Sequence, residues 1–442
     1  MSRPVGIGRR ASAGRRAGVT LAILATVSLV AAACSSSPRG SGGPGGSSGG
    51  GKAVVTATDT SCPSASSCFV VGNVSTLGGP IPGLFEGALV GTNAYLTYVN
   101  STGGVDGKKF RLLSENDSFS CAQNRSDVAA LVHQVIAFAG SFSLFDNCGG
   151  QVLKANPEVP DVSVTLSNST NALANNFSAN PLVPGWQAGP LLWFQKHYPE
   201  AVKHVGTLVA DAASSISQWN GQESAMKQEG YHISYETTFG PLDTNFTSEV
   251  IAMEQAGVQA VDLSDMNGAT AARIVAAMFQ QGFHPPLVFS AGPIYSENFV
   301  AEAGGPPAAD GIYLEQPEAL YLGTDAKVVP AVATFLHWVH TVSPGFSPDL
   351  YTVYGWASAE LLVTALAKAG PDVTQASLMK ALRSIDSFDA GGLMAPSDPA
   401  QKQPPTCWLL ARIVNGQFVR YHMPTTGFRC GTGYLRQQPG GS

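Results

Sequence analysis

Apolar positions change their spacing over residues 67–117, and the change predicts a strand, a helix and a second strand. Cys68–Val74 is a short, largely apolar run rich in β-branched residues, which is typical of a strand buried on both faces, and the Gly/Pro-rich loop Leu77–Gly83 ends it. From Leu84 apolar residues recur at roughly helical spacing until two glycines end the helix. Lys109–Ser114 resumes a strand. A strand that returns through a helix to the same sheet runs parallel to the first, and ligands of such sheets bind beyond the carboxyl ends of the strands.

The alternation of strand and helix continues along the chain in two series. Pro181, Pro184 and Gly185 separate the series and suit a crossover. Asn415 and Gly416 lie between two β-like runs near the carboxyl end and indicate a hairpin. After the opening unit, the expected strands are 135–140, 159–166, 205–210, 233–239, 260–263, 287–290 and 312–315. The expected helices are 121–134, 148–156, 189–198, 216–228, 248–256, 269–281, 328–342, 351–369 and 377–385.

Several short sequence motifs of the opening unit resemble those of a known protein family. They are a Gly-Ala step at Gly87, the Tyr-Val-Asn sequence from Tyr98, a Gly-Gly-Val-x-Gly-Lys turn from Gly103, and the acidic residues Glu115 and Asp117. With the order of elements, they make the chain from about residue 68 to about 421 similar to the leucine/isoleucine/valine-binding protein family. These are type 1 periplasmic solute-binding proteins that feed ABC importers.

The resemblance implies an α/β fold of two Rossmann-like lobes with parallel central sheets, joined by a three-segment hinge. Residues 53–184 and 315–388 would form the first lobe, and residues 185–314 and 389–430 the second. Residues 431–442 would be a disordered tail. A monomer would bind its ligand between the lobes, close, and dock on an ABC permease in the membrane.

Composition bounds the classes of function that the chain can serve. Its 442 residues are 44% hydrophobic, enough for two cores of ordinary size. Charged residues make up 13%, about half the usual 25%, and the formal net charge is -6. Nucleic-acid binding calls for a basic surface, so we expect no nucleic-acid partner. No motif indicates a cofactor.

The amino terminus is typical of a bacterial lipoprotein. A basic region is followed by an apolar run, Val19–Val30, and by three alanines before Cys34. We expect residues 1–33 to be a signal peptide, Cys34 to carry lipid, and 34–52 to be a flexible Gly/Ser linker. The body would then be held on the extracytoplasmic face of the cell membrane. The alternative is an uncleaved membrane anchor at 17–33, which is short for a span.

Six cysteines besides Cys34 suggest three disulfides outside the cytoplasm, although sequence alone allows 15 connectivities. Two pairs are suggested by position, because one flanks a tight loop and the members of the other both follow strands of one sheet. The expected pairs are Cys62–Cys68, Cys121–Cys148 and, by remainder, Cys407–Cys430. Their spacing does not fit a metal site, and we expect none.

Catalytic motifs are sparse. Ser377 and Lys380 match the Ser-x-x-Lys of penicillin-binding proteins, but no Lys-Thr-Gly partner accompanies them. A hydrolase would be expected to present a nucleophile beside a base. We therefore predict that the chain is not an enzyme.

Hydroxyl and acidic residues follow the expected strands and are the candidate ligand contacts. Small hydroxyls beside free N–H groups at helix starts can hold a carboxylate, although Ser and Thr also cap helices routinely. In the family these loops hold the ligand carboxylate. The candidates in the first lobe are Thr76, Ser141, Ser143, Ser167, Ser169 and Thr170. The candidates in the second lobe are Asp211, Asp265 and Asn267.

One departure from the family concerns the ligand ammonium. Family members that bind amino acids often have a Glu after the last strand, where this chain has Ala291 and Gly292. Asp211 or Asp265 could pair with an ammonium instead, because a desolvated cation needs an anion or several acceptors. Otherwise the ligand is uncharged or acidic.

These patterns predict the lipid-anchored substrate-binding protein of an ABC importer. The expected ligand is a small amino acid, or a related amide or organic acid, held between the two lobes. A ligand sensor on the same fold, signalling to a membrane partner, is the alternative. An extracellular enzyme is a third hypothesis.

Overall fold

The structure, a computed structural model, describes residues 68–438. The predicted signal peptide, the predicted lipidation site Cys34, the predicted linker and Cys62 lie outside the described residues. In the described range, no helix combines the length and the apolar character that a membrane crossing requires.

The first sheet has four strands in the order β2-β1-β3-β4, and all of its pairs are parallel. Every residue of β1 is buried, as its apolar sequence predicts. The predicted strand-helix-strand unit is thus confirmed, although β3 and β4 are shorter than expected. The strands are β1 (Cys68–Ser75), β2 (Lys109–Asn116), β3 (Ala137–Ala139) and β4 (Asp161–Val162).

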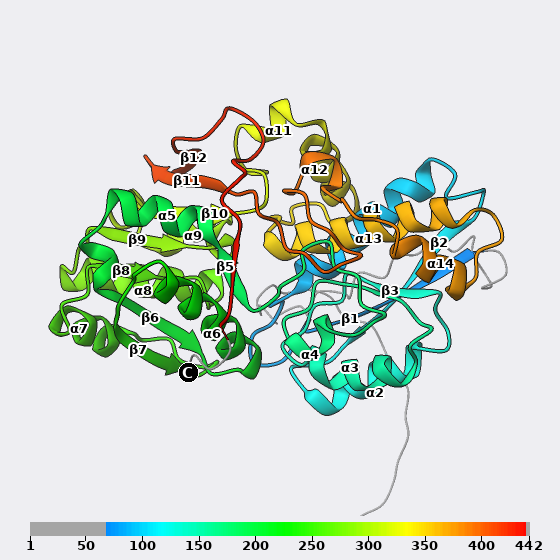
Figure 1. Cartoon of the computed structure of the whole chain (residues 1–442), viewed down its shortest axis with the longest axis horizontal. Coiled ribbons are helices and arrows are strands. Elements are labelled where there is room, and N and C mark those ends of the chain that lie inside the picture. Colours follow the sequence, from blue (N-terminus) through cyan, green and yellow to red (C-terminus); the bar gives the residue numbers. More distant parts are fainter. Residues whose placement is uncertain (1–67, 439–442) are drawn as a thin grey trace, which may run out of the picture. The chain divides into compact units, whose positions relative to one another are not determined.

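Helices from two distant parts of the chain pack beside this sheet or against one another (Figure 1). From the first part come α1 (Glu86–Ser101), α2 (Cys121–Leu131), α3 (Asp146–Ala155) and α4 (Asn168–Asn171). From the second come α11 (Asp325–Val328), α12 (Pro330–Val342), α13 (Leu350–Ala369), α14 (Gln375–Leu382) and the 3-10 turn η3 (Ala390–Gly392).

The contact between α1 and α13 depends on glycine. A Cβ built on Gly355 would lie 2.0 Å from the carbonyl oxygen of Ala88, and one on Gly91 would lie 2.0 Å from that of Thr352. The two backbones can approach this closely only because both positions lack a side chain. Helix α13 also contacts β3 and β4, so this late segment is part of the core over the first sheet.

The second sheet has seven strands in the order β12-β11-β10-β9-β8-β6-β7. Strands β6 to β10 pair in parallel, whereas β11 and β12 are antiparallel additions. Asn415 and Gly416 join the last two with φ of 50° and 74°, which confirms the predicted hairpin. The strands are β6 (Val205–Ala210), β7 (Ile233–Phe239), β8 (Ala260–Asp262), β9 (Leu287–Ser290), β10 (Tyr313–Gln316), β11 (Leu409–Val414) and β12 (Gln417–Arg420).

The helices that accompany the second sheet follow its strands in order. They are α5 (Ala188–His197), α6 (Ala213–Gln228), α7 (Thr247–Gln255), α8 (Gly268–Gln281), α9 (Phe299–Glu302) and α10 (Pro306–Ala309), with the 3-10 turns η1 (Ala201–Lys203) and η2 (Gly292–Ile294). A bidentate ion pair joins this sheet to α11, since the Arg420 Nε and Nη2 atoms lie 3.0 Å and 2.5 Å from the Asp325 carboxylate oxygens. The chain therefore leaves the first sheet after β4, returns to it after β10, and leaves it again before β11.

The prediction of a disordered tail from residue 431 is wrong for the end of the described chain. Strand β13 (Tyr434–Arg436) pairs antiparallel with β5 (Gly185–Gln187), the segment that leaves the first sheet. The Tyr434 hydroxyl donates to the Val183 carbonyl oxygen at 2.7 Å, and the Gln437 N–H donates to that of Pro184 at 3.0 Å. Figure 1 shows this red strand beside β5. Glycines around it suggest disorder, and the sequence does not show that β5 offers a free edge.

Candidate ligand-binding cleft

A cleft of about 580 Å³ lies among the loops that follow the strands of both sheets. Loops after β1, β2, β3 and β4 form one wall, and loops after β6, β7, β8, β9 and β10 form the other. Its volume falls within the range of small-molecule sites, about 300 to 1,000 Å³. The location agrees with the rule that ligands of parallel α/β sheets bind beyond the carboxyl ends of the strands.

Three residues predicted from the sequence line the second-sheet wall. Asp211 follows β6, and Asp265 and Asn267 follow β8. The two strands are neighbours in the sheet, so their carboxyl ends present these residues side by side. Asn267 also caps α8, because its Oδ1 accepts from the Thr270 N–H at 2.9 Å. Asp211 is exposed, whereas Asp265 is 8% exposed.

The carboxyl group of Asp265 is buried, and one of its oxygens, Oδ2, has no hydrogen-bond partner. Burial raises the pKa of this carboxyl well above its usual range, and the nearby carboxylates of Asp262 and Glu236 raise it further. An isolated buried carboxylate is costly, so this group needs either a proton or a cation.

Two further acids of the cleft, Glu315 and Glu318, escaped the sequence analysis. Glu315 accepts a 2.6 Å hydrogen bond from the Trp186 indole N–H, and neither carboxylate oxygen of Glu318 has a partner of ordinary geometry. Burial raises the pKa of each to about 8. The signal that could have found them is a Glu-Gln-Pro-Glu run across the end of β10 in a chain poor in charge.

The first-sheet wall is apolar and largely aromatic. The Phe85 ring lies 4.7 Å, centroid to centroid, from both Phe142 and Tyr351, and both contacts are edge-on. Tyr354 of α13 adds another ring. The loops after β1, β2, β3 and β4 contribute Ile81, Leu84, Phe85, Phe119, Phe142, Leu144, Phe145 and Leu166.

The six hydroxyl residues predicted for this wall do not line the cleft. Thr76 and Ser143 are buried, and both hydroxyls donate to Oδ2 of Asp117. The Ser141 hydroxyl accepts from the Val74 N–H at 3.1 Å.

The other three hydroxyls belong to the short helix α4. Ser167 caps it by accepting from the Thr170 N–H, and the Thr170 hydroxyl donates to the Asp146 carbonyl oxygen at 3.2 Å. Ser169 is exposed. Capping and internal hydrogen bonding therefore account for most of the hydroxyls that the sequence pattern selected.

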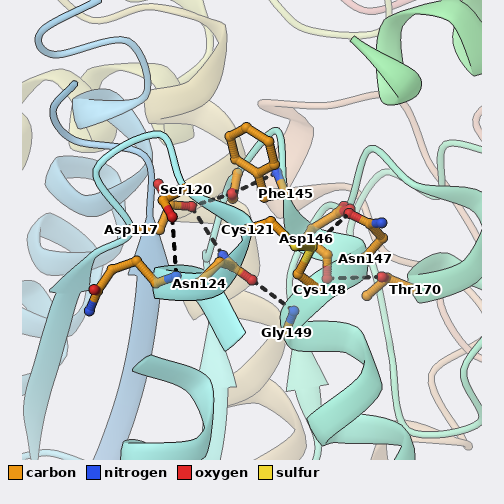
Figure 2. Close-up of a disulfide and its surroundings, with 12 residues drawn as sticks. Asp117, Ser120, Cys121, Asn124, Phe145, Asp146, Asn147, Cys148, Gly149 and Thr170 are labelled. Carbon is orange, nitrogen blue, oxygen red and sulfur yellow. Dashed lines mark hydrogen bonds between the residues drawn. A yellow bond between two sulfur atoms is a disulfide. The ribbon is translucent and has the colours of Figure 1, made fainter. Parts of the chain in front are cut away.

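A disulfide ties together the starts of two helices beside this wall. Cys121 opens α2 and Cys148 lies in the first turn of α3, and both residues line the cleft. Figure 2 shows Asn124 of α2 between Asp117 and Gly149: its Nδ2 donates to Asp117 Oδ2 at 3.1 Å, and its Oδ1 accepts from the Gly149 N–H at 2.8 Å. The predicted pairs Cys121–Cys148 and Cys407–Cys430 are confirmed.

The cleft lacks basic groups. Among the described residues that line it, none is Lys, Arg or His. The ionisable acidic side chains of the lining are the carboxyls of Asp211, Asp265, Glu315 and Glu318. The cleft thus combines an apolar first-sheet wall with an acidic second-sheet wall.

The Ser-x-x-Lys motif lies elsewhere. Ser377 belongs to the capping box at the start of α14, where it exchanges hydrogen bonds with Thr374. Neither Ser377 nor Lys380 lines the cleft.

Residues 69–417 match the profile of the family described as periplasmic binding protein, and the chain belongs to this family. No curated protein matches the chain significantly. Similar solved structures include a putative branched-chain amino acid ABC transporter from Rhodospirillum rubrum, 21% identical with a TM-score of 0.60, covering 80% of this chain and 100% of that one. A fatty acid ABC transporter substrate-binding protein from Thermomonospora curvata is 19% identical with a TM-score of 0.67, covering 82% and 92%.

A third structure is the branched-chain amino acid transporter substrate binding protein of Streptococcus pneumoniae in complex with isoleucine. It is 17% identical with a TM-score of 0.64, and the alignment covers 79% of this chain and 97% of that one. These likenesses show the α/β fold with parallel central sheets, as predicted.

Proposed function

We propose that the chain is the extracytoplasmic substrate-binding protein of an ABC importer. The observation that carries this proposal is the cleft of about 580 Å³, whose two walls come from two separate α/β sheets. The chain passes between these sheets three times, which suits a hinge that closes the walls on a ligand. A closed form would then dock on a permease in the membrane.

The similar solved structures include transport proteins described for branched-chain amino acids and for fatty acids. Small amino acids, amides, organic acids and fatty acids therefore form the first panel of compounds to test. Residues 53–184 with 315–388, and 185–314 with 389–430, are the proposed lobes.

A thermal-shift screen of residues 53–442 tests the binding function. A ligand present at 100 times its dissociation constant adds about 2.7 kcal/mol to stability, which gives a clear rise in melting temperature. Mass spectrometry of molecules retained from bacterial extract extends the panel. Glu254→Gln, at an exposed site on α7, is the matched control and should keep every response. The binding function is refuted if no panel compound raises the melting temperature and nothing is retained from extract.

The lipid anchor is a separate part of the proposal. A full-length Cys34→Ser variant should lose its lipid and appear in the soluble or secreted fraction, whereas the wild type sediments with membranes. Radiolabelled palmitate and fractionation measure both properties. If the variant stays in the membrane, the apolar run at 17–33 is an uncleaved anchor.

A further inference from the structure

The two walls of the cleft differ in chemistry, and the difference defines the ligand more narrowly than the family does. Phe85, Phe142 and Tyr351 form an aromatic surface on the first side. Asp265 stands on the other side, and its buried Oδ2 atom lacks a hydrogen-bond partner. A ligand that complements both walls has an apolar body, which packs on the aromatic surface, and a group that donates a hydrogen bond to the acidic side.

The first-sheet loops have few backbone N–H groups left for an anion. Asp146, which opens α3, accepts from the N–H groups of Leu166 and Ser167 at 2.6 Å and 3.0 Å. A carboxylate of the protein thus occupies the backbone donors that follow β4. A carboxylate of the ligand would have to displace it.

In the remaining first-sheet loops, backbone N–H groups also donate hydrogen bonds to side chains of the protein. Asn116 Oδ1 accepts from the N–H groups of Leu77 and Gly78 after β1, at 3.0 Å and 3.1 Å. After β3, the Ser75 hydroxyl accepts from the Phe142 N–H at 3.1 Å, and the Ser143 hydroxyl accepts from the Phe145 N–H at 2.9 Å. Ser143, which the sequence predicted as a ligand contact, thus stabilises one of the protein's own loops.

The start of α6 on the other wall is uncapped, because Ala212 makes no side-chain hydrogen bond there. The carboxyl of Asp211 precedes it and also lines the cleft, so an anion at this helix start would meet a like charge. The charge arrangement on both walls therefore disfavours a ligand carboxylate.

We propose that the cleft binds an organic amine cation with an apolar or aromatic body and no carboxylate, its ammonium paired with Asp265. This inference rests on the proposed function, because it names the class of cargo for the same cleft. Asp265 follows β8, in the second sheet, and lines the cleft, and its buried Oδ2 atom has no hydrogen-bond partner within the protein. Phe142 and Tyr351 supply aromatic surface on the opposite wall against which the apolar body of the ligand packs.

The test uses compounds that share a body and differ in charge. One set is phenethylamine, phenylalanine and 3-phenylpropionate, and the other is isoamylamine, leucine and 4-methylpentanoate. Isothermal titration calorimetry at pH 7.5 measures each against residues 53–442. In at least one set, the amine should bind at least 10-fold more tightly than both carboxylate-bearing members.

Asp265→Asn keeps the shape of the side chain and removes its charge. It should weaken amine binding about 10- to 100-fold, the effect of one hydrogen bond to a charged group. Glu254→Gln removes a charge from the same sheet's exposed helix α7 and should leave the affinity unchanged. The ranking of the compounds is measured on the wild type, so it stands even if the variant fails to fold.

Tighter binding of an amino acid or an acid in both sets would overturn the assignment of charge and leave the binding function intact. Unchanged amine affinity in a folded Asp265→Asn variant would overturn the role of Asp265. Absence of binding in both sets would also overturn the inference. In that case, a molecule retained from extract would show that the binding function survives.

Discussion

Glu318 offers a direct measurement of what a buried acid of the cleft costs the fold. Its side chain is fully buried, and neither oxygen accepts a hydrogen bond of ordinary geometry. Burial raises its pKa from 4.5 to about 8. The folded protein therefore keeps this proton at pH values where the unfolded chain has lost it, so that the free energy of unfolding falls as the pH rises from about 4.5 to about 8.

The magnitude follows from the shift. Each unit of pKa corresponds to about 1.4 kcal/mol, which places the loss for this one group between pH 5 and pH 8 at about 3 kcal/mol. Gln resembles the protonated acid and cannot ionise. Glu318→Gln should therefore match the wild type at pH 5 and exceed its free energy of unfolding by about 3 kcal/mol at pH 8.

Urea unfolding of both proteins at half-unit pH intervals from 5 to 8 measures the difference. Other buried acids, such as Glu315 and Asp262, are common to both proteins and cancel in the comparison. Glu254→Gln, at an exposed site, should run parallel to the wild type. Equal pH slopes for Glu318→Gln and the wild type would show that Glu318 ionises without cost, and the reasoning would be wrong.

Three further predictions concern stability. Replacing Cys121 and Cys148 by Ser removes a disulfide that closes a loop with a sequence separation of 27, so the unfolded chain gains conformational entropy. The free energy of unfolding, measured in urea, should fall by about 3.5 kcal/mol. A fall of less than about 1 kcal/mol would contradict this entropy argument. Gly355→Ala places a methyl group against the Ala88 carbonyl oxygen and should lower the free energy of unfolding by about 3 kcal/mol in the same assay. A variant as stable as the wild type would refute this prediction. Gly416→Ala, at φ 74°, should cost about 1 kcal/mol, and no loss would mean that the hairpin tolerates the strain.

The order of elements was predictable because the signals are local. Three strands of the second sheet, at Val205–Ala210, Ile233–Phe239 and Leu287–Ser290, have the predicted bounds. Strand β4 is only Asp161–Val162, although an apolar run predicts a strand over 159–166. Asp161 pairs with Phe138 of β3 and also forms a bridge with Asn176, and the ladder with β3 ends at Val162. The sequence pattern does not show the partner around Asn176.

The candidate site was predictable on one wall only. Asp211 and Asp265 follow strands whose adjacency is determined by the fold, so position in the sequence was enough to place them. The hydroxyls failed because Ser and Thr serve capping and ligand binding alike, and the choice depends on partners such as Asp117 and Asp146 that only the fold brings near. The aromatic wall also needed the fold, since Tyr351 comes from a helix far along the chain.

The pairing of β13 with β5 gives the carboxyl end of the chain a mechanical connection to the cleft. Tyr434 lines the cleft while its hydroxyl donates to the Val183 carbonyl on the first crossing between the sheets. A reporter protein fused after residue 438 would therefore follow directly on strand β13, which pairs with β5 at that crossing. Such a fusion is a suitable starting point for a fluorescent sensor of the cargo. Truncation before Tyr434 would remove β13 and its pairing with β5, and should be avoided when the protein is expressed.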